Sequence, residues 1–131
     1  VNRKTSTREK AIHLYQQLGH KCNQHGNYIG AAKAFERAAS LLMDPTDQSK
    51  MNNADDQTIM ATIDCLESAI RNYDAIHKYK HAGTLHYRCS LILRLLPGFS
   101  CEKVEQHHIK ALEYFTKPDH ELKQRKRIDV R

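Results

Sequence analysis

Nine histidines and four cysteines are the side chains of this chain that could bind a metal ion. His77 and His81 are four residues apart, a spacing that places two imidazoles on one face of a helix. Zinc sites usually take three or four ligands with a supporting second shell, and the sequence indicates no third ligand near this pair. The cysteines are widely spaced, without a C-x2-C pair, at Cys22, Cys65, Cys89 and Cys101. We therefore expect no metal and no cofactor, and we interpret the histidines as surface or packing residues.

The sequence also lacks the common motifs of catalysis. It contains no H-E-x-x-H motif, no nucleophile elbow, no glycine-rich phosphate loop and no spaced carboxylate pair in an evident pocket. We therefore expect a protein without enzymatic activity. Three of the four cysteines fall inside apolar helical patterns, where a free cysteine acts as a small core residue. This usage is typical of a reducing, intracellular setting.

The net charge of +6 is unevenly distributed along the chain. Residues 1–10 contain four Lys or Arg and one acid, and residues 117–131 contain six against three acids, so each end contributes +3. We interpret these ends as a basic N-terminal arm and a basic C-terminal tail beside a neutral body. A nucleic-acid-binding domain is one alternative function, because a few basic side chains suffice for phosphate contacts. The candidate contacts are Lys78, Lys80, Lys123, Arg125, Lys126 and Arg127.

Hydrophobic periodicity and turn residues predict about five helices. We expect them at residues 6–25, 28–43, 56–79, 83–96 and 100–115, with a polar loop over residues 45–55. No apolar run approaches the ~20 residues that span a bilayer, and the first residues do not resemble a signal peptide, so we expect no membrane partner. The sequence thus predicts one all-α domain over residues 8–116, either a compact helical bundle or a short irregular solenoid.

Residues 14–45 have the pattern of two antiparallel helices in close contact. Small and aromatic residues recur at Tyr15, Leu18, Gly19, Cys22, Gly26, Tyr28, Ala31, Phe35 and Ala38. This spacing resembles one tetratricopeptide-type hairpin, with Gly19 and Ala31 as the small residues at the helix crossing. The buried stripe of the first helix is expected to include Leu14 and Leu18. The sequence shows no second copy of this hairpin, so the helices that follow are expected to pack irregularly.

The tetratricopeptide resemblance also implies a polar groove that could hold a partner peptide. Its residues would be His13, Gln16, Gln17, His20 and Asn23. Members that bind acidic C-terminal tails have Lys and Asn where this chain has Gln16 and His20, which argues against a carboxylate clamp. A peptide-binding trafficking-type or solitary tetratricopeptide-like module is therefore a second alternative function.

Two segments in the second half of the chain resemble another family. Residues 85–95 read LHYRCSLILRL, and residues 110–115 read KALEYF. They resemble the C-terminal homology domain of the AFF family, the Lilliputian-type scaffolds of the super elongation complex. In that family a tetratricopeptide-like hairpin also precedes a long helix and a leucine-rich helix. The resemblance implies a nuclear domain that forms a homodimer, or a heterodimer with a related chain, and scaffolds transcription elongation factors.

The leucine-rich segment indicates where a protein partner would bind. Leu91, Leu93, Leu95 and Leu96 make the predicted fourth helix apolar on nearly every side, and five helices rarely bury such a helix completely. We therefore predict an interface at these four leucines. The leading function is a non-enzymatic interaction domain that dimerises or acts as a scaffold in a nuclear transcription-elongation regulator.

Overall fold

Helices make up all the regular secondary structure in residues 3–117, the part of the chain that this computed structural model describes. They are α1 (Arg3–Gln24), α2 (Tyr28–Leu42), α3 (Gln48–Asn52), α4 (Asp56–Ala75), α5 (Tyr79–Leu93) and α6 (Cys101–Phe115). Capping side chains define the starts of four helices, each accepting a hydrogen bond from the backbone N–H three residues later. The caps are Asn27, Asp47, Asp55 and Ser100. The all-α prediction is confirmed.

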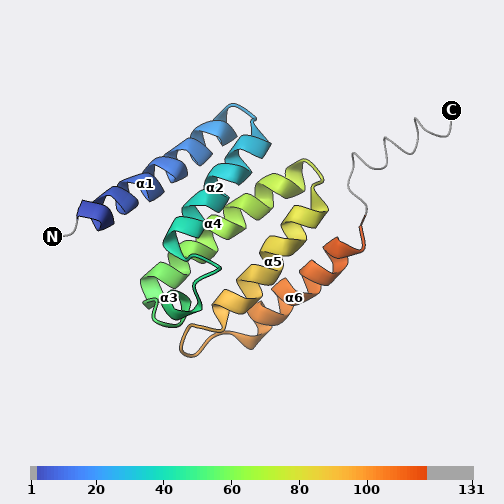
Figure 1. Ribbon diagram of the computed structural model, residues 1–131. Coiled ribbons are helices and arrows are strands. Elements are labelled where there is room, and N and C mark those ends of the chain that lie inside the picture. The colour runs from blue at the N-terminus through green and yellow to red at the C-terminus, as the bar shows by residue number, and fades with distance from the viewer. Residues whose placement is uncertain (1–2, 118–131) are drawn as a thin grey trace.

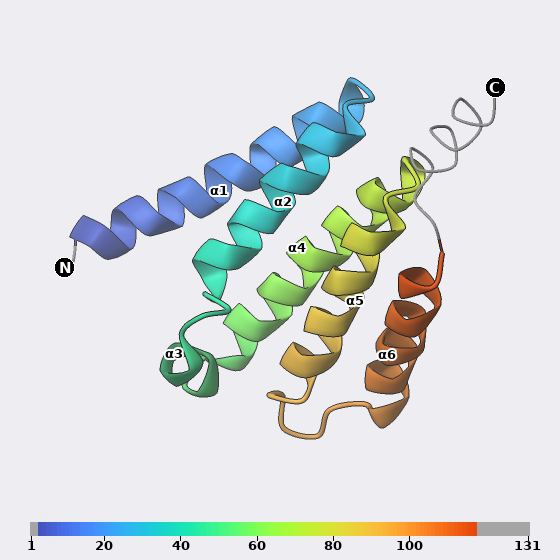
Figure 2. The same ribbon diagram turned by 45° about the vertical axis from the view of Figure 1, so that its right-hand side comes forward.

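The five long helices are stacked in chain order, as Figures 1 and 2 show from two directions. The principal contacts join α1 with α2, α2 with α4, α4 with α5, and α5 with α6. The short helix α3 lies in the connection between α2 and α4. Within the described residues, α1 and α6 are therefore the two edges of a compact helical bundle.

The core is thickest around α4, which packs against α2 on one side and α5 on the other. Ile59, Leu66 and Ala69 of α4 are at most 1% exposed. The face of α2 is made of small residues that let α1 and α4 approach closely. Its fully buried alanines are Ala31, Ala32, Ala38 and Ala39.

The α1–α2 and α4–α5 hairpins close with the same backbone turn. In the first, the N–H groups of Gly26 and Asn27 bond to the carbonyls three and five residues earlier. In the second, the N–H groups of His77 and Lys78 do the same, and His77 has a φ of 59° where Gly26 has 73°. These are the hydrogen bonds of a Schellman motif. The chain therefore forms a second helical hairpin that closes with the same turn, although its sequence does not repeat the pattern of the first and carries histidine at the left-handed position.

Several predicted boundaries also require correction. The helix expected at residues 56–79 ends at Ala75, because the left-handed backbone of His77 cannot continue it. α5 consequently begins at Tyr79 instead of residue 83, and it ends at Leu93 instead of residue 96. The polar segment expected as a loop contains α3, which makes the count six helices instead of five in residues 3–117.

α1 differs from the prediction in both its extent and its buried face. It begins at Arg3, so the N-terminal arm expected at residues 1–10 is largely helical. Leu14 and Leu18 are 63% and 49% exposed, so their assignment to the buried stripe was wrong. The face that meets α2 instead consists of the core-packed side chains Ile12, Tyr15 and Cys22 with the buried Gly19.

Candidate interaction surfaces

The four leucines predicted as an interface divide between core and surface. Leu93 is 7% exposed and belongs to the hydrophobic core, so its assignment to an interface was wrong. Leu95 and Leu96 follow the end of α5 and are half-buried against that core. Leu91 is the most accessible, with 41% of its surface exposed. Because α5 has α4 on one side and α6 on the other, most of its apolar circumference is covered within the domain.

The largest group of exposed apolar side chains on one edge of the bundle lies on α6. Ile109, Leu112 and Phe115 are 47%, 60% and 51% exposed, and their spacing of three residues places them along one side of the helix. We call these three residues the α6 edge. α6 packs mainly on α5, and the Phe115 ring lies beside that contact, since a Cβ atom on Gly83 of α5 would be 3.1 Å from it. An edge helix of a helical stack normally carries a polar outer face, and here Ile109 and Leu112 lie among the exposed polar residues Glu102, Glu105 and Glu113.

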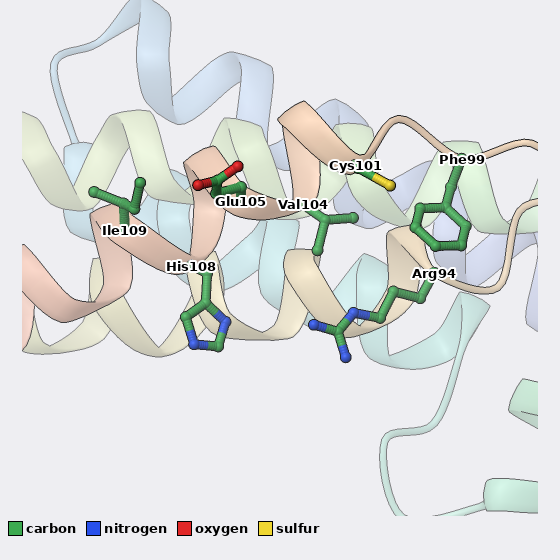
Figure 3. Close-up of a pocket in the computed structure, with 7 residues that line it drawn as sticks. All are labelled: Arg94, Phe99, Cys101, Val104, Glu105, His108 and Ile109. Atoms are coloured by element: carbon green, nitrogen blue, oxygen red, sulfur yellow. The ribbon is translucent and has the colours of Figure 1, made fainter.

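An open hollow of 690 Å³ adjoins the α6 edge. Its lining is Arg94, Phe99, Cys101, Val104, Glu105, His108 and Ile109. Figure 3 shows Arg94 and Phe99 at one end of this hollow and His108 and Ile109 at the other. Phe99 is 38% exposed, and Tyr87 of α5, which contacts the His108 ring, is 44% exposed. The apolar surface thus continues from α6 across the connection to α5.

Four of the five residues predicted as a peptide groove lie around one hollow. His13, Gln16, Gln17 and His20 of α1 line a 400 Å³ space together with residues of α2 and α4. The other lining residues are Phe35, Asp64, Cys65 and Ser68. Asn23, the fifth predicted residue, does not line it. The Gln16 side chain joins α1 to α4 across this hollow by donating a hydrogen bond to Cys65 Sγ at 3.4 Å.

His77 and His81, which are four residues apart in the sequence, do not lie side by side in the structure. His77 lies in the turn after α4, and its Nδ1 is 2.7 Å from the Tyr79 hydroxyl. His81 instead stands on α5 beside the Tyr73 ring, with ring centroids 5.0 Å apart. The two imidazoles therefore do not share a helical face. Among the described residues, no three His, Cys, Asp or Glu side chains are arranged to hold a metal ion.

A different histidine pair joins the last two helices. Nδ1 of His86 in α5 lies 2.8 Å from Nδ1 of His107 in α6, so one of these nitrogens must carry a proton that the other accepts. Nε2 of His107 lies 3.6 Å from Oε2 of Glu67 in α4. Burial, and next the proximity of His107, lowers the pKa of His86 to about 4. The sequence offered no signal for this cluster, because its members are far apart along the chain.

The predicted phosphate contacts are only partly within the described residues. Lys78 is half-buried at the start of α5, and Lys80 is exposed in its first turn. Both take part in interactions within the domain. Lys123, Arg125, Lys126 and Arg127 belong to the predicted C-terminal tail, which lies outside the described residues apart from Lys117.

Comparison of the chain with protein-family models, curated proteins and solved structures gave no match. Within the described part of the chain, no helix is both long enough and apolar enough to cross a lipid bilayer.

Proposed function

We propose that this chain is a non-enzymatic protein–protein interaction domain that dimerises through the α6 edge. The observation that carries the proposal is the exposure of Ile109, Leu112 and Phe115 on a helix at the edge of the bundle, whose principal neighbour is α5. The resemblance to the AFF family supports the same function, since it implies a dimerising scaffold in a nuclear transcription-elongation regulator. Such a domain would bring two copies of a longer regulatory chain together.

A second copy of the same domain fits this edge in a simple way. Around a two-fold axis, the same patch on both subunits makes the interface, so antiparallel α6 helices would place Ile109 against the partner's Leu112. Burying one exposed leucine contributes roughly 1.5–3 kcal/mol, and the two-fold axis doubles each contact. After the cost of association is subtracted, the free energy gained by burying these side chains supports a dimer of about micromolar affinity.

The test is the solution mass of the domain as a function of concentration, measured by sedimentation equilibrium. We expect a monomer–dimer equilibrium with a midpoint of about 1–100 µM. The variant Leu112→Glu should be monomeric throughout, with unchanged helicity. Leu14→Glu is the matched control, because Leu14 is 63% exposed on α1 at the opposite edge of the bundle. A parent domain that stays monomeric at high micromolar concentration, or a Leu14→Glu variant that dissociates equally, would rule out this dimer.

We propose peptide binding by the α1–α4 groove as the second candidate function. Its support is the grouping of His13, Gln16, Gln17 and His20 around one hollow opposite Asp64 of α4. These groups are mostly neutral, so the groove suits a helical peptide that offers amide or hydroxyl groups. Replacing Gln17 with Ala should weaken binding of such a peptide in a fluorescence-anisotropy titration, while the mass of the domain stays unchanged. An equal affinity for parent and variant would remove this candidate.

A further inference from the structure

We propose that Glu67, His86 and His107 form a proton-sensitive latch, which holds α6 on α5 at neutral pH and releases it in acid. The 2.8 Å contact between the two Nδ1 atoms is the central element of this latch. It joins α6, the helix at the edge of the bundle, to α5, the helix on which α6 principally packs. The proposal stands independently of any partner, because it concerns contacts inside one chain.

The number of protons bound by His86 and His107 explains why the contact between them can break. When the pair holds one shared proton, one Nδ1–H donates to the other Nδ1. The Glu67 carboxylate lies 3.6 Å from His107 Nε2, so His107 can donate from both ring nitrogens, to Glu67 and to a neutral His86. Once His86 is protonated as well, both Nδ1 atoms are donors, the hydrogen bond is lost, and two positive charges face each other.

The surrounding charges add to this repulsion. On α6, Lys103 and Lys110 line the same 470 Å³ hollow as the two histidines. On α4, Glu67 is the acid that faces the pair, and the pKa of its carboxyl is lowered by the His107 contact, with a further contribution from the nearby Arg71. The pair is also covered by the Tyr114 ring of α6, whose centroid is 5.3 Å from that of His86. One carboxylate therefore faces two histidines and two lysines.

The sign of the pH effect follows from the direction of the His86 shift. Its pKa is lowered from 6.5 to about 4, so the docked state is fully stabilised above pH 6.5 and loses this stabilisation as the pH falls towards 4. Over that interval the equilibrium between docked and released α6 should shift by up to about tenfold per pH unit. α2, which supplies none of the charged groups around the two histidines, should not follow this dependence.

The experiment is amide hydrogen exchange of the whole domain, read by mass spectrometry at about pH 7, 5.5 and 4.5 and corrected for the intrinsic effect of pH on exchange. Peptides from α6 are compared with peptides from α2. We expect protection of α6 to fall relative to α2 as the pH decreases. The variant His86→Gln can still hydrogen-bond to His107 but does not titrate, so its α6 should lose most of this pH dependence.

The matched control is His108→Gln, which removes the other histidine of α6 that contacts α5, through Tyr87. That variant should keep the pH dependence of the parent. If His86→Gln does not fold at neutral pH, His107→Gln provides the second variant, which removes the histidine that repels a protonated His86 and should therefore weaken the pH dependence without abolishing it. Loss of protection in α2 and α6 together would show global acid unfolding and overturn the latch. An unchanged pH dependence in a folded His86→Gln or His107→Gln variant would overturn it as well.

Discussion

Gly19 of α1 lies directly against the aromatic ring of Phe35 in α2. A Cβ atom at position 19 would lie 2.7 Å from both Cε2 and Cζ of that ring, well inside the distance at which carbon atoms pack. Phe35 is 3% exposed, and the His20 ring stands edge-on to it with centroids 5.2 Å apart. The ring therefore has little room to move, and the close crossing of α1 and α2 requires a residue without a side chain at position 19.

The first prediction is that Gly19→Ala destabilises the domain. Alanine favours the helical state by about 1 kcal/mol over glycine, but overpacking against a buried ring costs about 1–3 kcal/mol. We expect a net loss of about 1 kcal/mol in the free energy of unfolding, measured by urea denaturation at constant m value. Lys21→Ala, on the exposed face of α1, should change it by less than about 0.5 kcal/mol. A variant as stable as the parent would show that α1 can shift away from Phe35.

Local signals in the sequence predicted the first hairpin but not the second. Gly26 marks the first turn as a position that needs a left-handed residue, and the small residues Gly19 and Ala31 mark the crossing. At the second turn, His77 adopts the same left-handed conformation, and histidine at that position is not a signal for such a turn. The helical periodicity continues through Ile76, so the pattern alone extended α4 by four residues. The left-handed backbone of His77 ends the helix there, and the apolar pattern does not show it.

The candidate interaction surfaces could also be predicted only in part from the sequence. The sequence shows which residues are apolar, but not which of them have a neighbour in the fold. Leu93 was predicted at an interface because its helix is apolar on nearly every side, and the structure buries it in the hydrophobic core. The sequence predicted no interface at Ile109 and Leu112, because the exposed side of α6 becomes apparent only when its place at the edge of the bundle is known. The spacing of Ile109, Leu112 and Phe115 was the available signal.

A second prediction concerns Arg8, which belongs to the fold and not to a separate arm. Its guanidinium Nε donates to the Leu41 carbonyl at 2.6 Å, and its Nη2 lies 3.4 Å from the Leu42 carbonyl. A cation at this place satisfies carbonyls at the end of α2 and interacts favourably with the helix dipole. Arg8→Gln should lower the free energy of unfolding by about 0.5–1 kcal/mol. Lys10→Gln makes the same change of charge on α1, and an equal loss there would mean that net charge is responsible instead.

The third prediction separates the two leucines that the sequence treated alike. Leu93→Ala creates a cavity in the core and should cost about 2–4 kcal/mol in the free energy of unfolding. Leu91→Ala should cost less than about 1 kcal/mol, because 41% of its surface is exposed. Both values follow from thermal or urea unfolding of dilute protein, in which dimers do not contribute. Equal losses would contradict the assignment of Leu93 to the core and Leu91 to the surface.

The fourth prediction is an order of thiol reactivity. Cys101 is exposed, Cys22 is half-buried, and Cys65 and Cys89 are buried. Burial raises the pKa of Cys65, and it raises the pKa of Cys89 to about 12, so neither thiol forms the reactive thiolate near neutral pH. Iodoacetamide labelling followed by mass spectrometry should modify Cys101 first and Cys89 only on unfolding. Cys101→Ser should remove the fast phase, and rapid native labelling of Cys89 would contradict the packing of α5.

The fifth prediction is a loss of stability at high pH through Tyr114. Its hydroxyl donates to Asp74 Oδ2 at 3.1 Å, and burial followed by this hydrogen bond raises its pKa from 10 to about 12. The stabilisation is therefore complete below pH 10 and is lost as the pH rises from 10 towards 12. Tyr114→Phe should cost about 1–2 kcal/mol at neutral pH, because Asp74 loses a donor, and should unfold with a weaker dependence on pH in that alkaline interval. Urea unfolding at a series of pH values measures both effects.

Tyr87→Phe is the control, since Tyr87 is 44% exposed, and it should retain the alkaline dependence of the parent. The same alkaline dependence in Tyr114→Phe would show that another tyrosine, such as Tyr73 with its hydrogen bond to Glu36, is responsible.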